Sequence, residues 1–312
     1  MMNKKVKVLI ILCLPLVIIA FISVRHLINA TNVVDDQRAE SLEKFRNENA
    51  LSYQDVDFNM YSTHVILINL TTGEVMFEHE ANTRVYPASL TKMMTVLLGV
   101  EYAESETMTV NADFTRLMLD HASVAGFEYG EERTLTDVLH GAMLPSGADA
   151  TATIAYNVAG SYEAFVDLMN EKASALGMEN THFINTSGLH DDNQYTTAYD
   201  LAILLRYALD QPRFREVFTA REYPFTTLFG EQRVMNSTLF ANLWTTEFAG
   251  GEVIGGRTGF TLEAGRCLAS LATNGTDEFI LITLGADQDA AHHIAHISDA
   301  FTIYEYFLRV DR

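Results

Sequence analysis

The sequence predicts an α/β protein of the α+β type. One antiparallel sheet is built from both ends of the chain, helices flank it, and an all-helical lobe is inserted. Three observations lead to this fold class. Apolar, strand-like runs occur at residues 63–78 and return at residues 253–284. Residues 101–220, which lie between them, are mostly helical in pattern, so they indicate a lobe inserted between two halves of one sheet.

The predicted strands are short apolar runs separated by turn residues. Residues 63–69 contain the run Val65-Ile66-Leu67-Ile68, and Thr71-Thr72-Gly73 turns the chain into a partner strand at residues 74–78. A Gly-containing loop of this length between two such runs is typical of a hairpin. Further strands are expected at residues 253–259, 267–272 and 279–284, with a turn at Asn274-Gly275.

The predicted helices begin at residues that cap helix N-termini. Thr134 is followed three residues later by Asp137, as in a capping box, and Ser161 and Thr197 precede similar apolar repeats. Asn111 or Asp113 is expected to open a helix through Leu119. A final helix is expected from about residue 290 to 308, with an inward face made of Ile294, Ile297, Phe301, Tyr304 and Phe307.

The N-terminal segment predicts a membrane anchor. Basic residues 1–7 precede an apolar run at residues 8–24, which is at the short limit for crossing a bilayer. The basic flank before the run places the amino end in the cytoplasm and the rest of the chain outside. We therefore expect a single-pass protein of the cell membrane, or a secreted one if the leader is cleaved. Residues 25–55 are polar and are expected to form a stalk before a folded domain at residues 56–312.

Composition excludes one broad class of partner. The chain has 312 residues, of which 48% are hydrophobic, and a net charge of -20. That charge argues against nucleic acid, because phosphate binding needs a surplus of Lys and Arg. The two cysteines are Cys13, inside the apolar run, and Cys267. They are not expected to pair, so packing rather than a disulfide must hold the domain together.

The first candidate functional segment is the helix expected at residues 87–100, which is apolar on nearly every face. Pro87 suits the first helical position and places Ser89 in the first turn. Lys92 lies three residues later on the same face. Burial would lower the pKa of this lysine, and a neutral amine beside a hydroxyl can activate a nucleophile. The alternative is a lysine whose charged end reaches the surface.

Two further segments complete a candidate site. Ser146, in the turn at residues 144–150, presents a second hydroxyl, although a simple helix start with Asp149 in its first turn is the alternative. In Gly256-Arg257-Thr258-Gly259 the glycines permit close backbone approach, and Arg257 and Thr258 together suit a carboxylate. The alternative there is an ordinary turn.

Taken together, the three segments resemble the signature of the penicillin-recognising serine enzymes. In particular, the chain resembles the serine-type D-alanyl-D-alanine carboxypeptidases, which are low-molecular-mass penicillin-binding proteins. The resemblance covers roughly residues 60–310 and implies a β-lactamase/transpeptidase-like fold, with residues 56–312 as the penicillin-binding catalytic domain. The stretches that carry it, besides the three segments, are residues 86–95, 181–189, 195–200 and 258–268.

The resemblance implies acyl transfer on peptidoglycan stem peptides that end in D-Ala-D-Ala, with no cofactor and no metal. Ser89 would be the nucleophile, Lys92 the base and Ser146 a proton relay. The backbone N–H groups of Ser89 and Phe260 would hold the oxyanion, beside Gly259. Arg257 and Thr258 would bind the terminal carboxylate. β-Lactams would inhibit by acylating Ser89.

Two positions depart from the family pattern. Ala148 stands where the family usually has an asparagine that contacts the substrate backbone, and Arg257 stands where it usually has lysine. Losing one substrate hydrogen bond would cost about 1–3 kcal/mol. Ala148 therefore motivates a second hypothesis, a weak or inactive relative that binds cell-wall peptide or a partner protein. A β-lactamase or a cross-linking transpeptidase is the third, but no Glu-x-x-Leu-Asn loop occurs between residues 160 and 200.

Two histidine-containing segments are weaker candidates for cation sites. His292 and His296 have the i, i+4 spacing of some zinc ligands but lack the glutamate of a His-Glu-x-x-His motif. His190-Asp191-Asp192 is expected to be a solvated loop beside the cleft.

Overall fold

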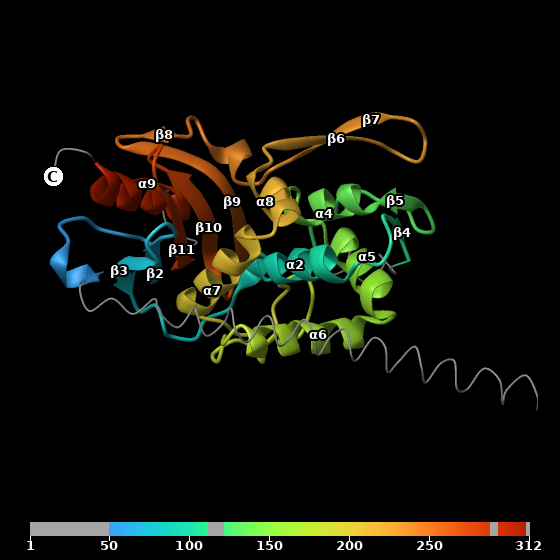
Figure 1. Cartoon of the computed structure of the whole chain (residues 1–312), viewed down its shortest axis with the longest axis horizontal. Helices are drawn as coiled ribbons and strands as arrows, with labels where there is room; N and C mark the ends of the chain where they lie inside the picture. The colour runs from blue at the N-terminus through green and yellow to red at the C-terminus, as the bar shows by residue number, and fades with distance from the viewer. Residues whose placement is uncertain (1–49, 112–121, 288–292, 310–312) are drawn as a thin grey trace, which may run out of the picture. The chain divides into compact units, whose positions relative to one another are not determined.

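A seven-stranded sheet forms the centre of the folded domain (Figure 1). The computed structural model describes residues 50–111, 122–287 and 293–309. The strand order is β1-β3-β2-β11-β10-β9-β8. The strands are β1 (Leu51–Ser52), β2 (His64–Asn69), β3 (Glu74–His79), β8 (Glu247–Phe248), β9 (Gly251–Thr261), β10 (Gly265–Thr273) and β11 (Glu278–Ala286).

The two ends of the chain meet in the middle of this sheet, as the sequence predicted. β2 pairs antiparallel with β11, with Leu67 opposite Leu281. Both strands are buried along nearly their whole length, which explains their continuous apolar runs. The predicted hairpin of β2 and β3 and the predicted turn after β10 are also present.

The folded domain begins before residue 56. Leu51 pairs with Phe77 and Ser52 with Glu78, so β1 adds a parallel edge strand beside β3. A short 3-10 helix, η2 (Tyr53–Asp55), follows, and the ring of Tyr53 packs against His79 with centroids 4.9 Å apart. The last residues assigned to the stalk therefore belong to the sheet domain, because paired backbone holds them there. This parallel pair also makes the sheet mixed rather than purely antiparallel.

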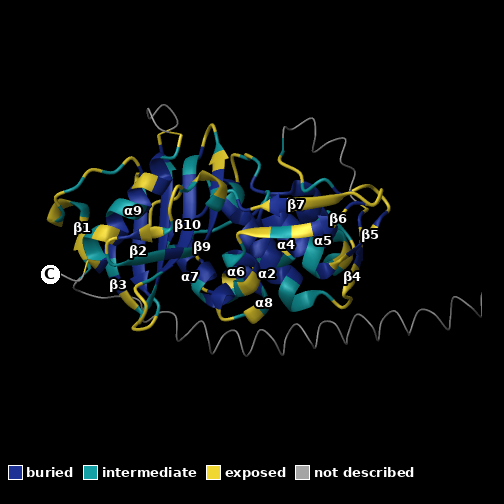
Figure 2. Cartoon of the chain, turned by 90° about the horizontal axis from the view of Figure 1, so that it is seen from above, coloured by how far each residue is buried: buried dark blue, intermediate teal, exposed yellow. Residues whose placement is uncertain are grey.

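Helices cover both faces of the sheet. On one face, α9 (Ala295–Leu308) buries Ile297 and Tyr304 in a core shared with β2, β3, β10 and β11. The Tyr304 hydroxyl lies 3.0 Å from Ser270 Oγ, which satisfies both polar groups inside this core. On the other face lies α7 (Ala198–Leu209), nearly all of it buried. The buried positions form one continuous band through the sheet and the helices (Figure 2).

The remaining helices gather around α2 (Lys92–Tyr102), whose residues 92–99 are all buried. The predicted caps are present, because the side chains of Thr134, Ser161 and Thr197 each accept a hydrogen bond from a backbone N–H three residues later. The other helices of the lobe are α4 (Leu135–Met143), α5 (Ala148–Ala159), α6 (Tyr162–Ala175) and α8 (Pro212–Thr219). The helix expected through Leu119 lies outside the described residues.

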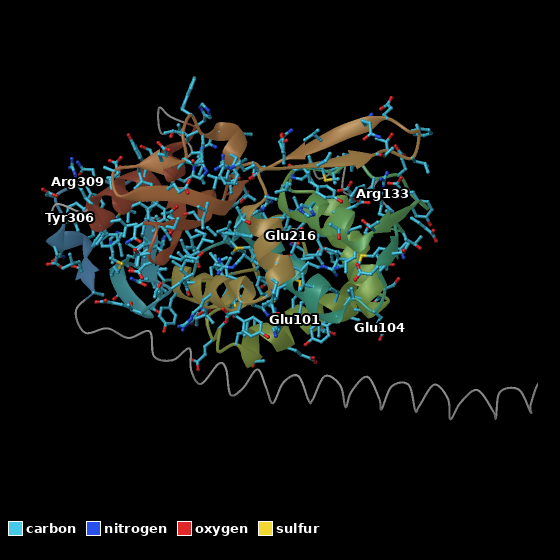
Figure 3. All side chains as sticks on the ribbon, turned by 45° about the horizontal axis from the view of Figure 1, so that its top comes forward. Glu101, Glu104, Arg133, Glu216, Tyr306 and Arg309 are labelled. Atoms are coloured by element: carbon cyan, nitrogen blue, oxygen red, sulfur yellow. The ribbon has the colours of Figure 1, made fainter. Side chains whose placement is uncertain are left out.

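The inserted lobe is not all-helical, so that part of the prediction was wrong. It contains a two-stranded sheet of β4 (Thr107–Thr109) and β5 (Glu132–Thr134), too short to show a period-2 pattern. A separate hairpin of β6 (Glu222–Thr226) and β7 (Gln232–Asn236) lies over it. Arg133 ties the two together: it pairs with Glu131 at 2.7 Å and donates to the Thr226 carbonyl at 2.5 Å, at the position labelled in Figure 3.

In the described ranges no helix combines the length and the hydropathy needed to cross a bilayer. The apolar run at residues 8–24 lies outside those ranges, as do residues 288–292 at the expected start of the last helix.

Candidate active site

Two distant segments, the η3–α2 segment and the turn before α5, bring Ser89, Lys92 and Ser146 together where the sheet meets the helical lobe. Lys92 Nζ lies 3.1 Å from Ser89 Oγ, and Ser89 Oγ lies 3.1 Å from Ser146 Oγ. Ser89 sits in a 3-10 turn, η3 (Ala88–Thr91), which runs directly into α2. The expected helix start at Pro87 is thus a tighter turn, but the i, i+3 spacing still places the hydroxyl beside the amine.

Lys92 is a buried amine held in place by the protein. Its side chain is only 3% exposed, and Nζ donates to the Ser187 carbonyl at 2.5 Å as well as to Ser89. Burial lowers the pKa of Lys92 well below its usual value. The positive charge of Arg257 lowers it further, while Asp149 acts in the opposite direction. The amine is therefore more readily neutral than an exposed lysine, as a proton acceptor must be.

Ser146 occupies a strained backbone conformation at the turn before α5. Its φ is +70°, a left-handed value that non-glycine residues rarely adopt, and Ala88 beside the nucleophile has φ +46°. Strain of this kind persists only where neighbouring structure imposes it, and it concentrates at functional sites. The turn is imposed here by the Gly147 N–H, which donates to the Gly141 carbonyl at 2.9 Å.

Arg257 lies inside the protein. This position differs from the expectation that its guanidinium would bind the terminal carboxylate of the substrate directly. It is 0% exposed, and its guanidinium donates to the Met143 carbonyl at 2.7 Å and the Ser89 carbonyl at 3.3 Å. It also donates to Ser146 Oγ. Burial lowers the pKa of Arg257 to about 9. Arg257 of β9 is therefore hydrogen-bonded to both the Ser89 segment and the Ser146 turn from the interior side of the site. Its guanidinium N–H groups are already bonded to protein oxygens.

Thr258, Gly259 and Phe260 continue β9 along the mouth of the site. Thr258 is half-buried and donates from Oγ1 to Thr238 Oγ1 at 2.7 Å. A Cβ added at Gly259 would lie 3.0 Å from the Ser89 nitrogen, so only glycine lets the strand pass this close to the nucleophile. The Phe260 side chain is 46% exposed, with the Arg266 guanidinium 5.0 Å from its ring.

Ala148 is sealed inside the lobe rather than facing the groove. It is 1% exposed, and its N–H donates to the Ser123 carbonyl at 2.8 Å. Three groups at the site were not assigned to it from the sequence. They are the Ser187 carbonyl, which accepts from Lys92, the Thr238 hydroxyl, which accepts from Thr258, and the Asp149 carboxylate, which acts electrostatically on Lys92. A backbone carbonyl carries no sequence signal, whereas Asp149 lies in the turn at residues 144–150 and was considered there only as part of a helix start.

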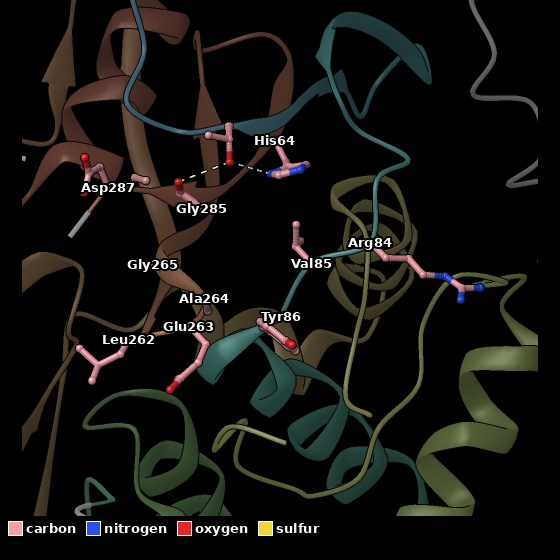
Figure 4. A pocket seen from close by; sticks show the side chains of 12 residues that line it. His64, Arg84, Val85, Tyr86, Leu262, Glu263, Ala264, Gly265, Gly285 and Asp287 are labelled. Atoms are coloured by element: carbon pink, nitrogen blue, oxygen red, sulfur yellow. Dashed lines mark hydrogen bonds between the residues drawn. The ribbon is translucent and has the colours of Figure 1, made fainter. Parts of the chain in front are cut away.

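A pocket of about 410 Å³ lies between Tyr86, the β9–β10 turn and the start of β2, and its lining includes neither serine of the site nor Lys92 (Figure 4). Thr63 Oγ1 bonds His64 at 2.8 Å on one wall, and the Arg84 side chain points away toward Asn180. His190, from the predicted loop beside the cleft, packs edge-on against Tyr86 and lies 3.9 Å from Glu263.

The described residues contain no group of three or more His, Cys, Asp or Glu side chains able to hold a metal ion. His292 lies outside them. His296 is buried, and burial together with the charge of Arg266 lowers its pKa to about 4.

Comparison with known proteins agrees with this geometry. The profile of the peptidase S11 family, described as D-alanyl-D-alanine carboxypeptidase, matches residues 48–288. D-alanyl-D-alanine carboxypeptidase DacF of Bacillus subtilis is 35% identical over 225 residues, covering 71% of this chain and 56% of the relative. DacA of Escherichia coli is 32% identical, covering 70% and 55%. The chain thus spans little more than half the length of these curated relatives.

Solved structures show the same architecture. The Streptomyces K15 DD-transpeptidase superposes with a TM-score of 0.70 at 26% identity, covering 80% of this chain and 99% of that one. A D-alanyl-D-alanine carboxypeptidase from Mycobacterium tuberculosis superposes with a TM-score of 0.69 at 21% identity, over 86% of this chain and 98% of that one. The fold is therefore the DD-transpeptidase/β-lactamase-like fold, and the chain belongs to the peptidase S11 family of D-alanyl-D-alanine carboxypeptidases, of the penicillin-binding protein type.

Proposed function

We propose that this protein is a serine D-Ala-D-Ala carboxypeptidase that removes the terminal D-alanine from peptidoglycan stem peptides. The observation that carries the proposal is the position of Ser89 Oγ, 3.1 Å from both Lys92 Nζ and Ser146 Oγ. Membership of the family and the names of the curated relatives support the choice of substrate.

In the acylation step, the neutral Lys92 amine takes the proton of Ser89 as Oγ attacks the carbonyl between the two D-alanines. The backbone N–H groups of Ser89 and Phe260 hold the oxyanion that forms. Gly259 brings the strand close enough for these two groups to act on one oxygen. Breakdown of the intermediate leaves an ester on Ser89 and expels D-alanine as its amine.

Ser146 relays the proton from Lys92 to the leaving amine. Because Arg257 donates a hydrogen bond to Ser146 Oγ, the hydroxyl proton of Ser146 is directed elsewhere, toward Ser89 or the leaving nitrogen. To bind the terminal carboxylate directly, the Thr258 hydroxyl turns its proton from Thr238 Oγ1 toward the ligand. The positive charge of buried Arg257 attracts the carboxylate from the interior side of the site. Water then attacks the ester, Lys92 accepts its proton and returns it to Ser89 Oγ as the ester bond breaks, and the shortened peptide leaves as a free acid.

β-Lactams would acylate the same serine, because they present a reactive carbonyl next to a carboxylate.

For localisation, we propose that residues 8–24 anchor the chain in the cell membrane with the catalytic domain on the outer face, or that the domain is secreted if the leader is removed. The basic flank at residues 1–7 supports this orientation. Protease treatment of intact cells tests it, and a protected domain would refute it.

A second candidate is transpeptidation, in which an amine rather than water releases the acyl group. It is favoured by the fold match to a DD-transpeptidase that the chain covers almost completely. The two reactions share every step up to the ester on Ser89.

The test uses the full chain in detergent. Fluorescent penicillin should label the wild type and the matched Ser161→Ala variant, which loses only a helix cap, but not Ser89→Ala. A pentapeptide ending in D-Ala-D-Ala should then release D-alanine. Released D-alanine accompanied by an amide product, when glycine is added, would favour transpeptidation. Absence of both labelling and release would overturn the enzymatic proposal and leave a peptide-binding module.

A further inference from the structure

Three charged side chains are buried together around the nucleophile. Lys92, Arg257 and Asp149 are 3%, 0% and 1% exposed. The proposed chemistry uses the first two but gives Asp149 no role. A buried carboxylate is unfavourable unless it is well compensated, so its presence here needs an explanation.

Asp149 is compensated by backbone and not by a cation. It accepts hydrogen bonds from the N–H groups of Ala125 at 2.7 Å, Gly126 at 2.9 Å and Phe127 at 3.1 Å. It also accepts one from Ala150 at 2.9 Å, in the first turn of α5. Within the described part of the chain it forms no ion pair, so these backbone N–H groups hold it in position.

The surrounding packing leaves this carboxylate no freedom to move. A Cβ added at Gly147 would lie 2.6 Å from Asp149 Oδ1 and 2.8 Å from Ala125 Cβ. The Ala148 N–H holds the Ser123 carbonyl as well, so residues 123–127 are tied to the Ser146 turn at both ends. The carboxylate therefore keeps a constant position relative to the nucleophile.

The charged groups that act on Lys92 electrostatically are Arg257 from β9 and Asp149 from α5. They act in opposite directions, because the arginine disfavours a proton on Lys92 and the aspartate favours one. When Lys92 accepts the proton of Ser89, Asp149 stabilises the new ammonium.

We propose that Asp149 is a positioning residue for the reaction: it fixes the wall at residues 123–127 and balances Arg257, so that Lys92 can hold the proton it takes from Ser89. The inference rests on the proposed function, since it assigns a role within that acylation step.

The experiment measures the acylation rate of full-length protein by fluorescent penicillin between pH 4 and pH 10. In Asp149→Asn, the acid midpoint should move down by about one pH unit, with a plateau about tenfold lower, as expected for loss of a nearby charge. Asp200→Asn is the matched control. Asp200 is also a buried aspartate at a helix start, where it accepts from a backbone N–H at 2.9 Å, but it is not among the groups acting on Lys92.

An unmoved or upward-shifted midpoint in Asp149→Asn would overturn the proposal, because simple structural damage lowers the plateau without moving the midpoint. If Asp149→Asn does not fold, Asp149→Ser provides the same loss of charge. If neither folds while Asp200→Asn does, Asp149 serves the fold alone and the proposal fails. If the wild type is not acylated, the proposed function fails. NMR of ¹³C-labelled lysine, with the Lys92 signal assigned by its loss in Lys92→Arg, then still reports whether removing Asp149 shifts that titration.

Discussion

Replacing Gly188 by alanine tests how tightly the loop that carries the Ser187 carbonyl must lie against the nucleophile. Gly188 has φ +82°, and a Cβ there would lie 1.8 Å from the Ala88 carbonyl oxygen and 2.9 Å from the Ser89 nitrogen. The left-handed conformation alone costs alanine about 1–2 kcal/mol. The clash adds to this, since both partners are backbone and neither can rotate away.

Relieving the clash requires the loop and η3 to separate by about 1 Å, and a displacement of that size at reacting groups can cost about 100-fold in rate. We therefore expect Gly188→Ala to reduce acylation by fluorescent penicillin about 100-fold. The matched control is Gly160→Ala, because Gly160 has φ +76° with nothing within 4 Å of the added Cβ. This control carries the conformational penalty without the clash.

Thermal unfolding separates the conformational penalty from the cost of the clash, since each kcal/mol of lost stability lowers the Tm of a domain this size by about 2–4 °C. Gly160→Ala should lose a few degrees and keep its acylation rate, whereas Gly188→Ala should lose more and acylate slowly. Equal melting temperatures and equal acylation rates in the two variants would show that the loop accommodates the added Cβ without displacing η3. That result would refute the predicted clash.

Three further outcomes follow from the buried groups. Arg257→Gln should move the acid midpoint of acylation to higher pH, because Arg257 lowers the pKa of Lys92; an unchanged pH profile would contradict this electrostatic role. Ala148→Asn should lower the free energy of unfolding by about 1–3 kcal/mol in urea titration, because the site is 1% exposed; an unchanged midpoint would show space beside it. His296 is neutral when buried, with a pKa lowered to about 4 from 6.5, so its contribution is present above pH 6.5 and lost as the pH falls toward 4. His296→Leu should therefore lose less stability than the wild type between pH 7 and pH 4 in urea titrations, and equal losses would contradict the burial argument.

Much of the fold was predictable because its signals are local. Continuous apolar runs at β2 and β11 identify buried strands, and the capping residues Thr134, Ser161 and Thr197 mark helix starts. The β1 strand and the β4–β5 pair were missed because two or three residues cannot display a period. Tertiary pairing alone holds such short strands.

The site likewise has one part that follows from local sequence spacing and another that depends on tertiary packing. The proximity of Ser89 and Lys92 follows from helical spacing, and the structure places their reactive atoms 3.1 Å apart. Ser146 and Arg257 could be joined to them only through the family resemblance, because their approach depends on the packing of lobe against sheet. The interior position of Arg257 was not predictable, since the sequence shows a charge but not the carbonyl oxygens that surround it.

The left-handed backbone of Ser146 is offset by the hydrogen bond that its side chain accepts. Glycine adopts this conformation without the penalty of about 1 kcal/mol that a side chain incurs, but Ser146→Gly would leave the buried Arg257 guanidinium without this acceptor, at a cost of about 1–3 kcal/mol. One hydroxyl thus serves both the stability of the turn and the proposed proton relay. Laboratory evolution that screens this protein for survival at high temperature alone would therefore tend to retain this serine, and with it the proposed relay.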